Sequence, residues 1–198
     1  MMRRLFTAGA LAIAIALCAG APRAQAQADA TGFIAQLGGQ AIQVLGPGVP
    51  ASERLARFRQ LFQNDFDVPG IGQFVLGRYW RTATPQEQQE FLGLFQEYIV
   101  EAYSARLGQY GGEPFRVTGN RPSGGDIVVT SQIIQKSGAP IEVDWYLIQA
   151  GGGFKITDVY VGGVSMKVTE RDEFGAVIQR NGGQIAPLLA QLRQKIQR

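Results

Sequence analysis

A long amphipathic helix over residues 84–107 constrains the fold of this chain more than any other feature. Thr84 can cap the helix, Pro85 suits its first position, and Glu87 completes a Thr-x-x-Glu capping box. Beyond this start, apolar side chains recur at helical spacing. They are Phe91, Leu92, Leu94, Phe95, Tyr98, Ile99, Ala102, Tyr103 and Leu107. Because this face is wide and carries four aromatic rings, a large apolar layer must cover it.

Shorter helices precede the long one. The spacing of apolar residues predicts a helix over residues 31–45, which the Gly-Pro-Gly-Val-Pro run 46–50 ends. A second helix is expected from Ser52, a plausible cap, and a third, short helix starts at Asp67. The glycine-rich run 108–112 is expected to end the long helix.

After Pro114 the period changes from helix to strand. Glycine-containing turns separate four strands, which indicates an antiparallel meander. The expected strands are 115–118, 127–135, 141–147 and 154–161. Two helices follow, one containing Val164, Val168, Phe174, Val177 and Ile178 and a last one over 185–196. The sequence therefore predicts an α+β domain with a curved four-stranded sheet, helices on its concave side and an apolar pocket between them.

The N-terminus has the pattern of a secretory signal. Residues 1–4 carry two arginines, residues 5–20 are apolar, and Ala24-Gln25-Ala26 supplies small residues for cleavage. The apolar run is short for a membrane span, although an uncleaved anchor is the alternative. We expect a signal peptide over 1–26, export to the periplasm, and a single domain over 27–198.

Composition excludes several classes of function. Histidine is absent, and the single cysteine, Cys18, lies within the expected signal, so no histidine- or thiol-based catalysis is expected. The chain has 19 Lys+Arg and 16 Asp+Glu, but three of the arginines lie in the expected signal. The remaining charge is balanced, which argues against nucleic-acid binding. Glycine runs 151–153 and 162–163 match no nucleotide-binding motif. We predict no catalytic residue, metal or cofactor.

Two groups of residues together resemble a known family. One is the Leu-Gly-Arg-Tyr-Trp-Arg run 76–81, followed by Ala-Thr-Pro 83–85 and Tyr103. The other combines Asp158-Val159, Gly163-Val164-Ser165, Arg171 and Phe174. In this order and spacing they resemble the MlaC or toluene-tolerance family of periplasmic lipid-shuttle proteins. The resemblance covers residues 30–195.

The resemblance implies a carrier that moves phospholipid between membranes and maintains outer-membrane lipid asymmetry. Its implied partners are an outer-membrane lipoprotein–porin complex and an inner-membrane ABC transporter with an MCE-domain subunit. Phe154 stands where the family commonly has tryptophan, and residues 169–171 form a looser version of an Asn-Tyr-Arg run. A related branch is associated with hopanoid biosynthesis genes. The ligand is therefore left open between phospholipid and a hopanoid-like lipid.

A carrier needs an apolar slot for acyl chains and a polar mouth for the headgroup. We expect the helices to supply Val75, Leu76, Tyr79, Phe91, Phe95, Ile99 and Tyr103 to this slot. We expect the opposite wall to contain Val117, Val129, Ile133, Val143, Trp145, Val159, Val164, Phe174 and Ile178. Arg78 and Arg81 are the headgroup candidates, since arginine pairs well with phosphate.

Two other functions remain open. An enzyme of the nuclear-transport-factor-like class would need Asp144 or Asp158 to point into the cavity as a base. A periplasmic adaptor would have a filled core instead. A carrier's pocket should collapse or retain lipid, because a dry cavity of ~500 Å³ would cost roughly 12 kcal/mol at about 24 cal/mol per Å³.

Overall fold

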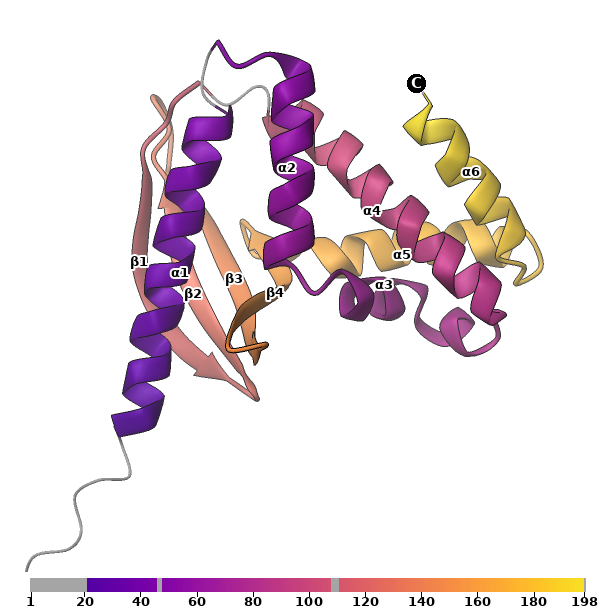
Figure 1. Ribbon diagram of the computed structural model, residues 1–198, viewed down its shortest axis with the longest axis horizontal. Coiled ribbons are helices and arrows are strands. Elements are labelled where there is room, and N and C mark those ends of the chain that lie inside the picture. Colours follow the sequence, from indigo (N-terminus) through magenta and orange to yellow (C-terminus); the bar gives the residue numbers. More distant parts are fainter. Residues whose placement is uncertain (1–20, 46–47, 108–110, 198) are drawn as a thin grey trace, which may run out of the picture.

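The computed structural model describes residues 21–45, 48–107 and 111–197 and has the expected α+β architecture. In Figure 1 helix α1 runs along the sheet, and helices α3 to α6 form a group to one side of it. Helix α2 lies between the sheet and this group of helices. The elements are α1 (Ala21–Leu45), α2 (Ala51–Asp65), α3 (Val68–Leu76), the 3-10 helix η1 (Gly77–Arg81), α4 (Pro85–Leu107), β1 (Phe115–Ser123), β2 (Asp126–Ile133), β3 (Ile141–Ala150), β4 (Gly153–Val161), β5 (Val164–Ser165), α5 (Met166–Arg180) and α6 (Ala186–Ile196).

The long helix α4 begins with the predicted capping box. The backbone N–H of Thr84 donates to Glu87 Oε2 at 2.9 Å, and the backbone N–H of Glu87 donates to Thr84 Oγ1 at 3.2 Å. The Thr84 N–H holds the pKa of the Glu87 carboxyl below its usual value. The helix start predicted from the sequence is therefore confirmed.

The sheet is an antiparallel meander in the order β1-β2-β3-β4-β5. Four of its strands were expected, and the fifth is the two-residue β5, which pairs with the end of β4. The first strand is longer than the predicted 115–118, because a bulge between Val117 and Gly119 lets pairing continue to Ser123. Pro122 fits there because β1 is an edge strand of the sheet, where a missing N–H costs little.

Two helix starts differ from the expectation. The first helix begins at Ala21 rather than Thr31, since the alanine- and glutamine-rich segment before Thr31 has high helix propensity. Thr31 lies inside the helix, where its hydroxyl donates to the Gln27 carbonyl. At α2 the capping position is Pro50, and Ser52 makes no cap. The α3 start at Asp67 is as predicted, because its carboxylate accepts from the Gly70 N–H.

Some expectations fall outside the described residues. These are the apolar part of the signal segment over 1–20, the break at 46–47 and the turn at 108–110. The expected cleavage site after Ala26 lies within α1. Among the helices that the structure describes, none combines the length and apolar character needed to cross a bilayer.

The buried apolar residues form two cores. The helical core lies between α3, α4, α5 and α6 and includes Phe91, Phe174 and Leu188. The sheet core lies between α1 and the sheet and includes Ile34 and Val129. In the sheet core, Val129 of β2 stands opposite Trp145 of β3, so both occupy the covered face. The two cores meet at Phe66, just after the end of α2, because this side chain packs against both of them.

We expect Thr84→Ala to lower the free energy of unfolding by about 1 kcal/mol, within the usual 0.5–2 kcal/mol for losing a hydroxyl cap. Urea denaturation followed by circular dichroism measures this change. Ser52→Ala is the matched control, because Ser52 makes no cap. Equal losses in the two variants would contradict the capping role of Thr84.

The contribution of Glu87 to stability should depend on pH. Its pKa is lower in the folded chain, so its stabilisation is present above its ordinary pKa near 4.5 and is lost as the pH falls through the folded value. The stability difference between the wild type and Glu87→Ala should therefore shrink towards zero at acidic pH. A difference that grows on acidification would refute this assignment.

Candidate functional site

A cavity of about 250 Å³ lies where the two cores meet, and nearly all of its surface is apolar. Its walls come from α2, α3, α4, strands β2 to β4 and the start of α5. The lining residues are Phe58, Phe62, Phe66, Ile71, Phe95, Ile99, Tyr103, Ile133, Val143, Trp145, Asp158, Val159, Val161, Met166, Lys167 and Glu170. The cavity is partly open to solvent, as a site that loads an apolar ligand requires.

Phe66 closes one side of the cavity. It forms a bridge with Ile156 of β4, and its ring centre lies 4.9 Å from that of Phe62. The cavity then follows β4 to Val161, five residues further along the strand, or about 17 Å at strand spacing. The charged lining residues come from β4 beyond Ile156 and from the first turns of α5. The charged lining residues therefore lie at the α5 end of the cavity, away from Phe66, although the surface that they present to it is apolar.

The ring of Trp145 is fixed in the cavity wall by a buried hydroxyl. Its indole N–H donates to Ser131 Oγ at 2.8 Å, and the Ser131 hydroxyl donates to the Val143 carbonyl at 3.3 Å. Ser131 is fully buried. Because both polar groups are satisfied, the indole can expose its apolar face to the cavity.

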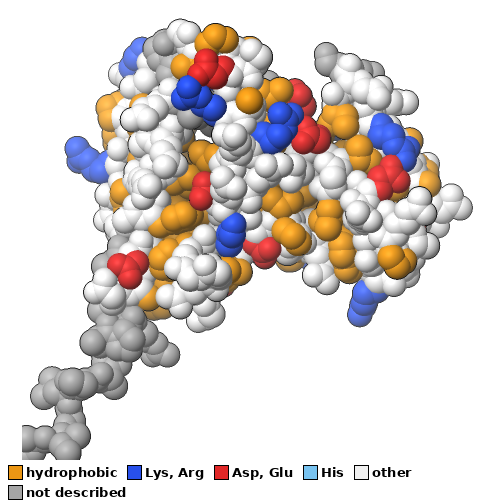
Figure 2. Space-filling view, viewed as in Figure 1, with side chains coloured by type: hydrophobic (Ala, Val, Ile, Leu, Met, Phe, Trp, Pro, Cys, Tyr) orange, Lys and Arg blue, Asp and Glu red, His pale blue; other side chains and the backbone are white. Residues whose placement is uncertain are grey.

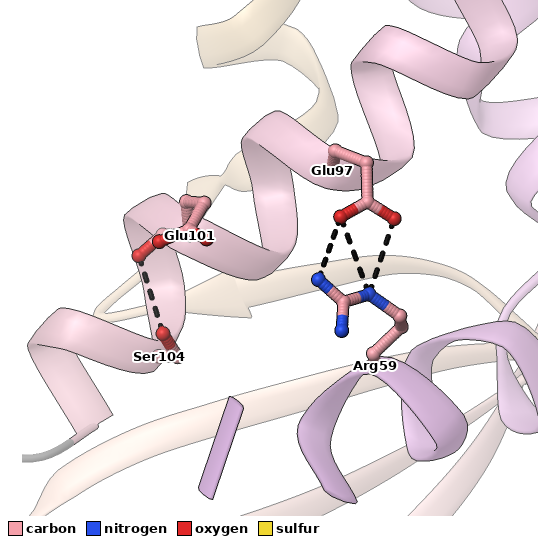
Figure 3. A network of polar contacts seen from close by, with 4 residues as sticks. All are labelled: Arg59, Glu97, Glu101 and Ser104. Atoms are coloured by element: carbon pink, nitrogen blue, oxygen red, sulfur yellow. Dashed lines mark hydrogen bonds and ion pairs between the residues drawn. The ribbon is translucent and has the colours of Figure 1, made fainter. Parts of the chain in front are cut away.

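An ion pair joins the helices on either side of the cavity. Figure 3 shows Arg59 of α2 reaching Glu97 of α4, with Glu101 one turn further along. The Arg59 Nη2 donates to Glu97 Oε2 at 2.7 Å and its Nε donates to Oε1 at 3.1 Å. The hydrogen bond to Glu97 raises the pKa of Arg59. Phe58 and Ile99, neighbours of this pair on the same helices, line the cavity.

The two carboxylates at the cavity are both engaged. Asp158 Oδ2 accepts from the Ser165 hydroxyl at 2.6 Å, while Oδ1 accepts from the backbone N–H groups of Val159 and Lys167. Glu170 is buried, and its Oε1 accepts from the Tyr103 hydroxyl at 3.3 Å. Through these hydrogen bonds Asp158 ties the end of β4 to β5 and to the start of α5.

Asp144 does not reach the cavity. It accepts from Arg121 at 2.9 Å and from the Thr130 hydroxyl at 2.5 Å. Trp145, the next residue, lines the cavity, so strand alternation places Asp144 on the other face of the sheet. Of the two carboxylates that the enzyme alternative requires, Asp144 is thus outside the cavity, whereas Asp158 lines it with both oxygens hydrogen-bonded. Among the described residues, no acidic cluster could hold a metal ion.

Seven of the predicted lining residues surround the cavity. They are Phe95, Ile99, Tyr103, Ile133, Val143, Trp145 and Val159. The others lie elsewhere. Val75, Leu76, Phe91, Phe174 and Ile178 are buried in the helical core, and Tyr79 packs against it. Val117 and Val129 belong to the sheet core beneath α1. Val164 is 54% exposed at the β4–β5 hairpin.

Helix geometry explains this division. The first half of α4 faces other helices: the Phe91 ring meets the Phe174 ring edge-on, with centres 6.1 Å apart. Phe95 stands at the boundary, because it contacts Phe174 and also lines the cavity. From Phe95 onwards α4 also supplies Ile99 and Tyr103 to the cavity, so its aromatic face is divided between helix packing and the cavity wall.

Sequence reasoning missed the α2 aromatics and, in α5, it named Phe174 and Ile178 instead of the first residues of the helix, which line the cavity. In α5 the cavity-facing and core residues follow one four-residue spacing, Met166, Glu170, Phe174 and Ile178. Starting the helix at Val164 hid this pattern, because β5 intervenes and α5 begins at Met166. The polar Glu170 also interrupted the apolar stripe. The spacing from Phe174 back to Glu170 was the available signal.

The two headgroup candidates lie away from the cavity. Arg78 and Arg81 are exposed on η1, just before the start of α4. The nearest cavity residue of α4, Phe95, lies roughly ten residues along, or about 15 Å of helix rise. The Arg78 guanidinium instead donates to the hydroxyl of Tyr79 at 2.7 Å.

The face of the molecule seen in Figure 2 shows no large patch of one charge. In Figure 2 the Lys and Arg side chains lie singly or beside Asp and Glu, with apolar side chains between them. A surface depression of about 500 Å³ is also lined by Phe66, and partly by Gln63, Gln96 and Lys155. Most of the surface of this depression is apolar, but part of it is polar, whereas the surface of the cavity is nearly all apolar.

Comparisons with known proteins agree with this geometry. The family model described as MlaC protein matches residues 41–194. The chain belongs to the MlaC family. The resemblance seen in the sequence is thereby confirmed, and the matched region includes the cavity-lining residues.

Two curated relatives carry informative names. The toluene tolerance protein ttg2D of Pseudomonas putida is 28% identical over 121 residues, which span 60% of this chain and 56% of that protein. The intermembrane phospholipid transport system binding protein MlaC of Haemophilus influenzae is 26% identical over 145 residues, spanning 69% of this chain and 67% of that protein. The matched regions therefore span between about half and two thirds of these relatives.

A solved structure shows the same fold. It is described as the phospholipid-binding protein from Ralstonia solanacearum in complex with a phospholipid. The alignment has a TM-score of 0.72 and 23% sequence identity, and it covers 85% of this chain and 97% of that one. The overall α+β architecture is thus that of MlaC proteins.

Adding volume should be tolerated at the cavity but not in the sheet core. We expect Val143→Phe to change the free energy of unfolding by less than about 1 kcal/mol, because the ring can enter the cavity. The same substitution at Val129, which is fully buried in the sheet core, should cost about 1–3 kcal/mol. Chemical denaturation of both variants checks this, and equal costs would contradict the cavity.

The Arg59–Glu97 pair should show a measurable coupling energy. A double-mutant cycle with Arg59→Gln and Glu97→Gln is expected to give about 0.5–1 kcal/mol, since the pair is bidentate but partly exposed. The i,i+4 pair Arg57–Glu53 within α2 is the control and should give about 0.3–0.5 kcal/mol or less. A coupling of zero for Arg59–Glu97 would show that the pair does not hold α2 to α4.

Proposed function

We propose that this chain is a periplasmic lipid carrier that shields acyl chains in the cavity between α2, α4, α5 and the sheet. The observation that carries the proposal is the nearly wholly apolar cavity between two separate cores. Shape and apolar surface are sufficient for carriage. The carboxylates that border the cavity are occupied in fixing α5 and Tyr103, so they supply structure rather than reactivity.

The size of the cavity implies that its walls move during loading. A diacyl lipid has roughly thirty methylenes, and if each takes about the space of a water molecule, ~30 Å³, the tails need roughly 900 Å³. The cavity has about 250 Å³. Loading therefore requires α2 and the sheet to move apart. The Arg59–Glu97 ion pair joins α2 to α4 on the helical side of this opening. Each shielded methylene then contributes about 0.8 kcal/mol relative to water.

Family membership supports a wider role. We propose that residues 1–26 are a cleaved signal peptide that directs the chain to the periplasm. There it would exchange phospholipid with an outer-membrane lipoprotein–porin complex and an inner-membrane ABC transporter with an MCE-domain subunit. Such exchange would maintain outer-membrane asymmetry. The names of the Pseudomonas and Haemophilus relatives, and the phospholipid bound by the Ralstonia protein, support this choice of ligand over a hopanoid-like lipid.

The direct test is the lipid content of the full chain purified from its native host. Denaturing organic extraction followed by mass spectrometry should yield stoichiometric phospholipid. A hopanoid-like lipid would assign the same cavity to a different ligand. The absence of any stoichiometric lipid would count against carriage.

Filling the cavity should reduce the lipid load. In Val143→Phe, a ring that displaces about two methylenes costs roughly 1.6 kcal/mol, or a little more than tenfold in affinity. Val177→Phe is the matched control, because Val177 packs against the helical core and does not line the cavity. Native mass spectrometry of both variants gives the loaded fraction. The carrier proposal predicts a loss in Val143→Phe alone.

A further inference from the structure

Two positive side chains of α5, Lys167 and Arg171, converge on the ring of Phe74 beside the cavity. The Lys167 Nζ lies 4.8 Å from the ring centre, and the Arg171 Cζ lies 5.0 Å from the same centre. The two residues are four apart on one helix, so their Cβ atoms are about 5–6 Å apart on one face. The two charges are thus within about one Debye length, ~10 Å, of each other.

Two carboxylates, Asp158 and Glu170, line the cavity with Lys167, and both accept hydrogen bonds from other groups. The ion pairs found among the described residues include neither Lys167 nor Arg171. Lys167 also stands in the first turn of α5, where the helix dipole disfavours a cation. Asp158 offsets the dipole by accepting the Lys167 backbone N–H at 3.1 Å, but it forms no ion pair with the ammonium group. An anion placed between the two side chains would relieve their repulsion.

The location of the two cations matches the shape of an amphiphile. Lys167 lines the cavity, whereas Arg171 lies one turn further along α5 and is exposed to solvent. Gly77 sets the position of the guanidinium, since a Cβ at residue 77 would lie 3.2 Å from Arg171 Nε. The positive pair therefore stands at the α5 edge of the cavity, where the Lys167 side chain borders the apolar interior and Arg171 reaches solvent.

We infer that Lys167 and Arg171 form an anion subsite at the cavity mouth, which takes the phosphate group of a lipid whose tails occupy the cavity. The inference rests on the proposed carrier function and names its headgroup contacts. Arginine offers a planar fork for two phosphate oxygens, and lysine supplies a compact charge. This subsite takes the role that the sequence suggested for Arg78 and Arg81.

The test compares two lipids with identical tails. Lipid-free full chain is incubated with detergent-dispersed dioleoyl phosphatidic acid or with dioleoylglycerol, which lacks the phosphate, and the bound lipid is quantified by mass spectrometry. We expect Lys167→Gln combined with Arg171→Gln to weaken phosphatidic acid binding about tenfold or more, because charge-assisted hydrogen bonds to phosphate are lost. Dioleoylglycerol binding should be unchanged. Lys167→Arg, which keeps the charge, should retain most of the affinity.

The control variant removes the same charge elsewhere. Arg78→Gln combined with Arg81→Gln should leave binding of both lipids unchanged. An equal loss for the two lipids in the Lys167/Arg171 variant, or an equal loss in the control, would overturn the subsite while leaving carriage intact. Wild-type chain that takes up neither lipid would refute carriage itself.

A separate arm distinguishes a lipid headgroup from free phosphate. Inorganic phosphate is titrated into the wild type by calorimetry, with and without bound phosphatidic acid. Weak binding that the lipid blocks supports the headgroup assignment. Tight binding of inorganic phosphate that the lipid does not affect would overturn it.

Discussion

The structure depends on apolar surface that the chain's own side chains leave uncovered. The aromatic face of α4 packs tightly where it meets α5, as the contacts of Phe91 and Phe95 with Phe174 show. One turn later the same face also borders a cavity, through Ile99 and Tyr103. A single helix thus changes from core element to cavity wall along its length. The sheet opposite does the same, because Val129 is packed beneath α1 while Val143 faces the cavity.

An empty apolar cavity lowers the stability of the fold, and the neighbouring polar contacts oppose its collapse. Extrapolating about 24 cal/mol per Å³ to 250 Å³ gives roughly 6 kcal/mol as an upper bound. This approaches the whole stability of a typical domain, about 5–15 kcal/mol. The Trp145–Ser131 hydrogen bond and the Arg59–Glu97 pair fix the wall positions, because closing the cavity would require them to rearrange. Binding of apolar tails recovers the contacts that the walls lack.

Local signals made most of the fold predictable, while the site depended on where elements meet. The capping box at Thr84 and the strand alternation around Trp145 are short-range patterns, and both were read correctly. Periodicity marked Phe91 and Ile99 as equally apolar, but it cannot tell which half of a helix faces a packed neighbour. The roles of Phe58 and Phe62 depend on how α2 is placed between the two cores, which no local pattern specifies. Lys167 was hidden because a lone lysine in a helix resembles a solvated surface residue.

The Asp158 carboxylate has a mechanical consequence. One side chain on β4 binds both the Ser165 hydroxyl in the neighbouring strand and the backbone of Lys167 at the head of α5. This carboxylate therefore links β4, the β4–β5 hairpin and the start of α5. A force that a partner protein applied to the exposed hairpin around Val164 would therefore be transmitted to α5. It would displace the residues of β4 and α5 that line the cavity at the same time.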